Sequence, residues 1–419
     1  MPTVSRTSSQ PTLSLTSATG IALAACLALA LSTRSRAEAN DLELRYIQPD
    51  DQTKTSSAVV VPAKANLAHT AQILPLNEKG EVVGRDKPEE QIDKVLDLLA
   101  NSLKEAGSGL DRLVRVNLYG TSPAVLVQAK EALAKRLEGP ARPVITVVAG
   151  QLAHPDARIA LDAIAVTSKE AGPVGPSRPG QRAGAPFAVL PEGAKVYISG
   201  QAEQHADLAE ATRRTLKSLE KTLAYLGLDR LHVVHVKAFL QPMSDASVFE
   251  REMTACFGAG KVPPFSYVEW KSGAKTPIEI ELIARAGPRA EAAQLESITP
   301  TGMTASPVFS RVVCVNHGDL FYLSGLNGPA DAKGTDQVEA IFGTFKEILD
   351  AVGSDFEHLA KATYYVTDDE ASKALNDLRP RYYNPKLPPA ASKAIVPSVG
   401  DAKRTVTLDM VGVVKAAKP

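Results

Sequence analysis

The chain has 419 residues, of which 44% are hydrophobic, and its 47 lysines and arginines balance 47 aspartates and glutamates. This length allows several globular domains, and the apolar fraction is sufficient to give each of them a core. A net charge of zero provides no general attraction for polyanions or anionic lipid, so nucleic-acid binding is not expected.

The first segment, residues 1–39, has the pattern of a secretory signal peptide. It contains an apolar run at 21–31 and ends in Ala-Glu-Ala at 37–39, which is a small-residue cleavage pattern. The run is shorter than the about 20 residues that a membrane-spanning helix needs. We therefore expect an exported protein, periplasmic or extracellular. Lipidation at Cys26, which ends a Leu-Ala-Ala-Cys sequence similar to a bacterial lipoprotein box, stays open as an alternative.

One pattern recurs three times along the rest of the chain: apolar residues at helical spacing, a glycine, and an extended apolar run. The glycines are Gly107, Gly227 and Gly353, which lie 120 and 126 residues apart (227 − 107 and 353 − 227). This spacing is the size of a domain and exceeds the repeat length of a solenoid. The sequence therefore predicts three related domains in tandem.

The middle domain displays the order of elements most clearly. Strands are predicted at 195–200, 233–240 and 277–283, and helices at 211–226 and 246–257. This order predicts an α+β fold in which helices cover one face of a mixed sheet. Three such sheets could bury their free faces together around a pseudo-threefold axis, so that one chain takes the place of a homotrimer.

Segments rich in proline, glycine or polar residues separate the domains. The expected domains are 40–168, 186–286 and 303–419, joined by linkers at 169–185 and 287–302. Beyond Cys26 the chain has two cysteines, Cys256 and Cys314, and whether they pair stays open. The seven histidines are scattered and no metal-binding motif is present, so no metal site is expected.

The repeats resemble the RidA family, also called the YjgF or endoribonuclease L-PSP family. The resemblance rests on a strand ending in Ser-Gly-Gln and on a late Ile-Glu-Ile-Glu strand, which the second domain has at 199–201 and 278–281. It implies a chorismate-mutase-like fold, a trimer with ligand pockets between subunits, and hydrolysis of reactive enamines or imines such as 2-aminoacrylate to a keto acid and ammonia. This chemistry requires no metal or organic cofactor.

The resemblance also assigns candidate site residues. Arg142, in a Pro-Ala-Arg segment, is the candidate for holding a substrate carboxylate through two parallel hydrogen bonds. Glu279 is the candidate for moving protons at the imine carbon. The candidate substrate contacts are the residues that end the early strands: Thr70, Gln72, Ser199, Gly200, Gln201, Ser324 and Gly325.

The candidate charges are not repeated in every domain. Alignment by motif puts Phe265 and Ala391 at the place of Arg142, so at most one pocket keeps the arginine. The place of Glu279 is taken by alanine at 160 and by threonine at 407. If both groups must come from one subunit, no pocket is complete. A second acidic position persists in all three domains as Asp162, Glu281 and Asp409.

Two functions are compatible with this pattern of residues. One is an exported enamine or imine hydrolase in which Arg142 anchors the carboxylate, and the other is a non-catalytic protein that binds a small carboxylate. Export favours the second, because the reactive enamines made by dehydratases arise mainly in the cytoplasm. An endoribonuclease is least favoured, because the chain is neutral and has no stripe of basic and aromatic residues.

Overall fold

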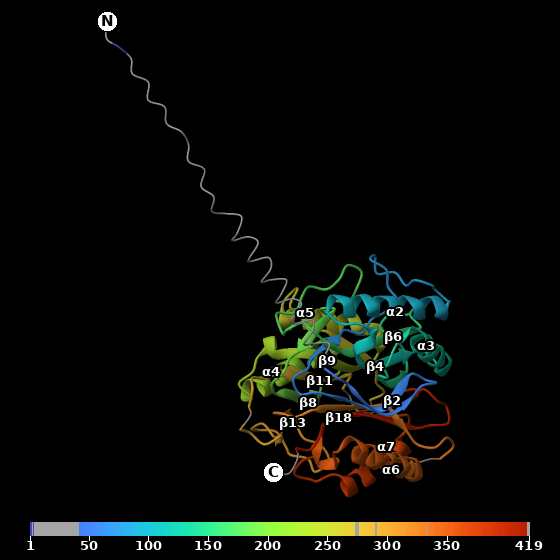
Figure 1. Ribbon diagram of the computed structural model, residues 1–419. Helices are drawn as coiled ribbons and strands as arrows, with labels where there is room; N and C mark the ends of the chain where they lie inside the picture. The colour runs from blue at the N-terminus through green and yellow to red at the C-terminus, as the bar shows by residue number, and fades with distance from the viewer. Residues whose placement is uncertain (2, 4–41, 273–275, 290, 333, 417–419) are drawn as a thin grey trace. The chain divides into compact units, whose positions relative to one another are not determined.

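Figure 1 presents the computed structural model of the chain, which describes residues 1, 3, 42–272, 276–289, 291–332 and 334–416. The expected signal peptide at 1–39 lies outside these residues apart from residues 1 and 3, so it stays a prediction. Contacts divide the chain into residues 1–42 and 43–419, and the fold described below is that of the second unit. Within the described residues, no helix combines the length and the apolar character needed to cross a membrane.

One order of elements occurs three times: strand, helix, strand, helix, strand, strand, with one additional short strand before the first helix of the third repeat. The first repeat consists of β3 (Asn66–Thr70), α2 (Pro88–Glu105), β4 (Leu113–Gly120), α3 (Pro123–Arg136), β5 (Val144–Ala149) and β6 (Ile159–Thr167). The second consists of β8 (Lys195–Gln201), α4 (Leu208–Tyr225), β9 (Val233–Leu240), α5 (Ala246–Phe257), β10 (Phe265–Glu269) and β11 (Ile278–Arg285). The third consists of β14 (Leu320–Leu323), β15 (Leu326–Asn327), α6 (Gly334–Val352), β16 (Leu359–Val366), α7 (Asp369–Tyr382), β17 (Ala390–Ile395) and β18 (Val406–Val413).

Each repeat is preceded by one or two further strands. They are β1 (Arg45–Asp50) and β2 (Thr55–Val61) before the first repeat, β7 (Phe187–Leu190) before the second, and β12 (Leu295–Ile298) and β13 (Val312–Val315) before the third. The connection into the repeat is four residues long in every case, at 62–65, 191–194 and 316–319.

Helix α4 illustrates why these segments are helical. Its N-cap residue Asp207 accepts a hydrogen bond from the Glu210 N–H at 2.8 Å, and its leucine-rich face is buried against the sheet. After the helix comes Gly227, whose φ of +73° is a conformation that favours glycine. Gly107 and Gly353, with φ of +70° and +85°, follow α2 and α6 in the same way. The three predicted glycine stops are therefore confirmed.

Each sheet combines the strands of one repeat with leading strands that belong to another. The strand orders are β5-β4-β6-β3-β7, β10-β9-β11-β8-β13-β12 and β1-β2-β14-β18-β16-β17, with β15 also pairing with β18. The pairs β4–β5, β9–β10 and β16–β17 are parallel, and the other strand pairs of these orders are antiparallel. The leading strands of the second repeat therefore complete the sheet of the first, those of the third complete the second, and those of the first complete the third.

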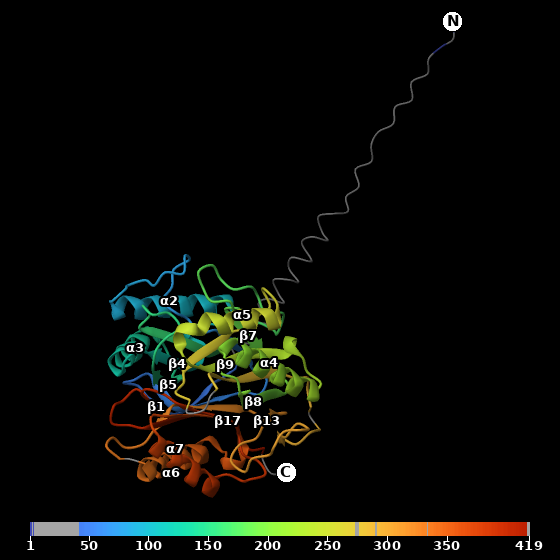
Figure 2. The ribbon, with the colours of Figure 1, turned by 180° about the vertical axis from the view of Figure 1, so that it is seen from behind.

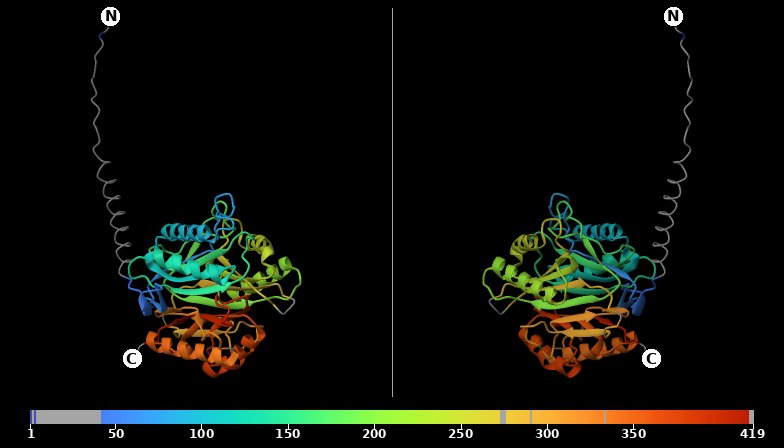
Figure 3. Two further views of the ribbon diagram at one scale, coloured as in Figure 1. Left: turned by 90° about the vertical axis from the view of Figure 1, so that its right-hand side faces the viewer. Right: turned by 90° about the vertical axis from the view of Figure 1, so that its left-hand side faces the viewer.

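The helices cover one face of each sheet (Figures 2 and 3). The opposite faces share an apolar cluster. This shared cluster includes Tyr119 of β4, Phe239 of β9 and Tyr365 of β16, which are at most 3% exposed. The faces without helices are therefore buried against other repeats rather than exposed to water. The predicted α+β repeats, with mixed sheets and helices, are confirmed, whereas closure around a pseudo-threefold axis stays a prediction.

Part of the segment expected to be a linker is a strand. Residues 295–298 form the edge strand β12 and pair with β13.

The two cysteines of the described residues do not pair. Cys256 is partly buried and Cys314 is buried, and both are free thiols.

A pair of introduced cysteines tests the sharing of strands between repeats. Ala68 of β3 and Val189 of β7 pair in register, and antiparallel partners have Cα atoms about 4.5–5.5 Å apart, a separation that a disulfide can bridge. We expect Ala68→Cys/Val189→Cys, in a chain with Cys256 and Cys314 replaced by serine, to form a disulfide that peptide mass spectrometry detects. The control is Val189→Cys/Val196→Cys, a pair that would be adjacent if β7 folded back on β8. A bond in the control and none in the first variant would contradict the shared sheet.

Candidate functional site

Strand register defines the equivalent positions of the three interfaces. Ile145 pairs with Val116, Phe265 with Val236, and Ala391 with Ala362, at the same place in β4, β9 and β16. The motif alignment that put Arg142 in line with Phe265 and Ala391 is therefore wrong by three residues, and Ile145 occupies that place. Pro140 and Pro143 both fit the motif, and only the pairing of β5 with β4 distinguishes them.

Arg142 lies two residues before β5, in an open groove of about 700 Å³. Its Nη1 donates to the carbonyl oxygens of Gly139 at 3.0 Å and Ala141 at 2.8 Å. Its Nε and Nη2 both donate to Oδ1 of Asp51, at 3.0 and 2.5 Å. The Arg142 side chain is 10% exposed, whereas that of Asp51 is 87% exposed. The guanidinium is thus held firmly and already has a carboxylate beside it.

Glu279 lies at the interface of the second and third repeats. The N–H of Gly200 donates to the hydroxyl of Ser392 at 3.1 Å, and this hydroxyl also hydrogen-bonds Glu279. Gly200 has no room for a side chain, because a Cβ there would lie 1.8 Å from a Glu279 carboxyl oxygen. Burial, with Glu281 close by, raises the pKa of Glu279 to about 7. Ala391, at the arginine position of this interface, brings no charge.

The other predicted contacts of the second repeat are inside the protein. Ser199 and Gln201 are buried, and the amide of Gln201 donates to the hydroxyl of Thr222 at 2.9 Å. Among the described residues, the Ser199 hydroxyl and the Gln201 side-chain carbonyl oxygen have no hydrogen-bond partner, and a substrate role for both residues stays a prediction.

At the interface of the first and second repeats, Phe265 fills the arginine position. The N–H of Gln72 donates to the Phe265 carbonyl at 2.9 Å, and its side chain donates to the Tyr267 carbonyl at 2.9 Å. The aromatic rings of Phe265 and Tyr267 pack edge to face, with centres 5.3 Å apart. Thr70 accepts a hydrogen bond from the Ala163 N–H within its own repeat. This interface therefore has an aromatic ring at the arginine position and keeps a cavity of only about 30 Å³, whose lining includes Arg182, already paired with Glu250.

At the interface of the first and third repeats, the contacts are between neutral groups. The hydroxyl of Ser324 and the N–H of Gly325 donate to the carbonyl of Ile145, at 3.0 and 3.1 Å. Thr407, at the position of Glu279, donates to the Leu326 carbonyl at 3.0 Å. Neither an arginine nor an acid occupies the two family positions here.

The structure therefore does not bring the two predicted catalytic residues together. Arg142 contacts Asp51 in the groove, and Glu279 contacts Ser392 at another interface. The pairs of residues at the arginine and acid positions are Ile145 with Thr407, Ala391 with Glu279, and Phe265 with Ala160. Among these described residues, Glu279 is the one charged group.

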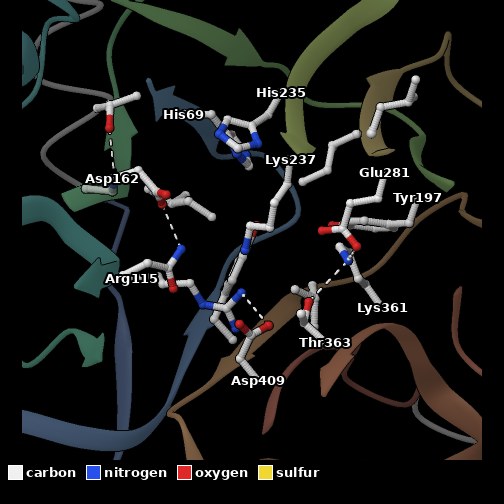
Figure 4. A pocket seen from close by; sticks show the side chains of 18 residues that line it. His69, Arg115, Asp162, Tyr197, His235, Lys237, Glu281, Lys361, Thr363 and Asp409 are labelled. Carbon is white, nitrogen blue, oxygen red and sulfur yellow. Dashed lines mark hydrogen bonds and ion pairs between the residues drawn. The ribbon is translucent and has the colours of Figure 1, made fainter. Parts of the chain in front are cut away.

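A separate polar cavity of about 40 Å³ lies where strands of all three repeats meet (Figure 4). Six buried charged residues line it: Arg115, Lys237, Lys361, Asp162, Glu281 and Asp409. The three acids are those of the second acidic position noted in the sequence. The cavity has room for about two or three water molecules, at ~15 Å³ each, and is too small for an amino-acid-derived substrate.

At least one polar contact joins each pair of repeats in and around this cavity. In the order first to third, third to second, and second to first, the contacts are Arg115 to Asp409 at 3.4 Å, Lys361 to Glu281 at 2.6 Å, and Ser266 to Asp162 at 2.6 Å. Removing one partner from such a buried pair typically costs about 3–5 kcal/mol, because the other charge is left without compensation. The cluster therefore links all three repeats, and its cavity is too small to serve as a substrate site.

Two histidines also line the cavity. The ring centres of His69 and His235 are 6.0 Å apart. Burial lowers the pKa of both to about 3, and the charges of Lys237 and Lys361 add to the effect at His235. Burial also disfavours the charge of Lys237, but Tyr365 and the three carboxylates outweigh it and raise the pKa of this lysine.

The three acids were visible in the sequence, but their assembly with buried cations was not predicted, although a signal for it was present. Polar residues alternate with apolar ones in three otherwise hydrophobic strands: Arg115 and Asn117 in β4, His235 and Lys237 in β9, and Lys361 and Thr363 in β16. Alternation puts each pair on the sheet face without helices. In the described part of the chain, no group of three or more Asp, Glu, His or Cys side chains is arranged to hold a metal ion.

The raised pKa of Glu279 predicts a specific pH dependence of stability. The folded chain keeps this proton up to about pH 7, whereas the unfolded chain loses it near the ordinary value of about 4.3. The contribution of Glu279 to the free energy of unfolding is therefore complete below about pH 4. It falls by up to about 3 kcal/mol as the pH rises to 7. Glu279→Gln should reduce the loss of unfolding free energy between pH 5 and 8, measured by urea titration. The exposed control Glu131→Gln should behave as the wild type, and an unchanged profile in Glu279→Gln would contradict the assignment.

The lowered pKa of His235 predicts a change of the opposite sign. The unfolded chain takes up a proton near pH 6.5, whereas the folded chain does so only near pH 3. The contribution of His235 to the free energy of unfolding is complete above about pH 6.5. It falls by about 2 kcal/mol between pH 6.5 and pH 5. His235→Gln should therefore lose less stability than the wild type over this range. The exposed control is His317→Gln, and equal losses in both variants would show that His235 is not buried and neutral.

The comparisons with known proteins agree with the threefold repetition. The model of the endoribonuclease L-PSP family matches residues 50–167, 185–286 and 301–412. A search of curated proteins found no match.

Solved structures of bacterial proteins are similar to parts of the chain. The Rid-family protein YyfB from Yersinia pestis, of unknown function, is 28% identical, and the match covers 29% of this chain and 98% of that protein with a TM-score of 0.25. A YjgF-family protein from Neisseria meningitidis is 18% identical, with 29% and 97% covered and a TM-score of 0.23. A YjgF/YER057c/UK114-family protein from Mycobacterium tuberculosis is 19% identical, with 25% and 86% covered and a TM-score of 0.22. Because the family matches span most of its length, this chain belongs to the endoribonuclease L-PSP family, also called RidA or YjgF, and contains three repeats of its fold.

Proposed function

We propose that this protein binds a small carboxylate at Arg142 and does not hydrolyse imines. The observation that carries the proposal is the separation of the two charged groups that the family chemistry combines. Arg142 lies away from the arginine positions of the three interfaces, and Ala391 occupies that position at the interface that holds Glu279. The two lysines near Glu279 are already engaged, because Lys361 pairs with Glu281 and Lys393 donates to Ser372 and Asn376. Without an arginine at this position, a substrate carboxylate would lack a bidentate partner there.

Carboxylate binding is supported by the way Arg142 is held. Its Nη1 is anchored by two backbone carbonyls, so its Nε and Nη2 edge keeps a fixed direction. This edge presents two parallel N–H donors, the arrangement that matches a carboxylate. Asp51 occupies this edge, which supports the proposal that a ligand carboxylate can bind there. We also propose, from the pattern of residues 1–39 alone, that the protein is exported.

Calorimetric titration with pyruvate, combined with an assay of 2-iminopropanoate decay, tests the proposal. We expect the wild type to bind pyruvate. Arg142→Ala should bind it at least about tenfold more weakly, because a charge-assisted bidentate contact is lost. The control is Arg85→Ala, which removes an exposed arginine of the same repeat that pairs with Asp156. We expect the decay of 2-iminopropanoate to be the same with and without the protein.

Two results would contradict the proposal. One is pyruvate binding that Arg142→Ala leaves unchanged. The other is an accelerated decay of the imine that Glu279→Gln abolishes, which would identify the protein as a hydrolase that needs no arginine.

A further inference from the structure

We infer that Asp51 is a built-in competitor for the Arg142 site, so that a ligand carboxylate binds by displacing it. This inference rests on the proposed function and adds a regulating residue to the same site. Asp51 occupies the guanidinium edge that a ligand would need, at 3.0 Å from Nε and 2.5 Å from Nη2.

The contact of Asp51 is an incomplete version of what a free carboxylate can make. A single oxygen, Oδ1, accepts both hydrogen bonds from Arg142. A carboxylate free to orient itself can place one oxygen on Nε and the other on Nη2, which is the stronger bidentate geometry. The ligand therefore has a geometric advantage over Asp51.

Asp51 is also easily displaced. It lies on the turn between β1 and β2 and its side chain is 87% exposed. The shape of the turn depends on its neighbour Asp50, whose Oδ1 accepts hydrogen bonds from the N–H groups of Gln52 at 2.8 Å and Thr53 at 3.2 Å. Asp51 can therefore leave the guanidinium while the turn stays intact, and ion pairs with such an exposed partner contribute little to stability.

The surroundings of Arg142 can accept the rest of a small ligand. The groove of about 700 Å³ is lined by residues of the first repeat, including Tyr46 and Pro140, and by Asp319 of the third. Arg142 itself stays in place when Asp51 leaves, because Gly139 and Ala141 hold Nη1. Binding thus requires movement of one exposed side chain.

A ligand can bind only those molecules in which Asp51 has left Arg142. The apparent affinity is therefore the intrinsic affinity multiplied by the fraction of molecules with an open site. Because an exposed ion pair is weak, Asp51→Asn should tighten pyruvate binding by about two- to fivefold. The effect should vanish when Arg142→Ala is added, because the competitor and the ligand then lack the same partner.

The experiment is calorimetric titration of pyruvate into the full chain and into Asp51→Asn, Glu43→Gln and Arg142→Ala. Glu43 lines the same groove, so Glu43→Gln removes one negative charge there without touching the Arg142–Asp51 pair. Tightening in Asp51→Asn that clearly exceeds the effect of Glu43→Gln supports the inference. Thermal unfolding of each variant checks that it is folded.

The remaining outcomes separate the two proposals. One outcome is that Asp51→Asn binds pyruvate no more tightly than the wild type, or no more tightly than Glu43→Gln, while Arg142→Ala loses binding. This outcome would show that Asp51 is not a competitor, but it would still support a carboxylate site at Arg142. Weaker binding in Asp51→Asn would also overturn the competitor role, because Asp51 would then help to hold the ligand. No binding of pyruvate by any variant would overturn the proposed function itself.

Discussion

The sharing of strands between repeats is the constraint on which the rest of the structure depends. Four residues connect the leading strands to each repeat, and four residues span at most about 14 Å. That is enough to cross between sheets that pack about 10 Å apart. Because the leading strands of each repeat complete the sheet of another, every repeat is tied to the others by backbone hydrogen bonds as well as by the shared apolar cluster.

Apart from Glu279, the charged side chains lie in different places from the equivalent positions of the three interfaces. The interfaces between repeats are made of unlike sequences, and Phe265, Ile145 and Ala391 occupy the position where the family resemblance implies an arginine. Charges are instead concentrated in the central cavity, where each acid or base has a partner from another repeat, and in the outer groove at Arg142. A fused chain can lose a symmetric active site and keep its fold, since these central contacts do not require three identical sequences.

The sequence was sufficient to predict the three repeats, the order of their elements and the glycines that end the first helices, because these depend on local periodicity and on backbone conformation. It was not sufficient for the register of β5, since Pro140 and Pro143 both fit the family motif and only pairing with β4 decides between them. The sharing of strands between repeats could not be predicted from the sequence either. A four-residue connection is compatible with a hairpin within one sheet or with a crossing to another sheet. The contact of Asp51 with Arg142 joins residues 91 positions apart, and no local pattern indicates it.

The measurement that tests the account most directly is a crystal structure of the protein grown with pyruvate. The account predicts pyruvate density on the Nε and Nη2 edge of Arg142, with Asp51 turned away into solvent. Pyruvate density beside Glu279 and Ser392, with Asp51 still on Arg142, would contradict it, because the ligand would then occupy an interface that has no cation at the arginine position.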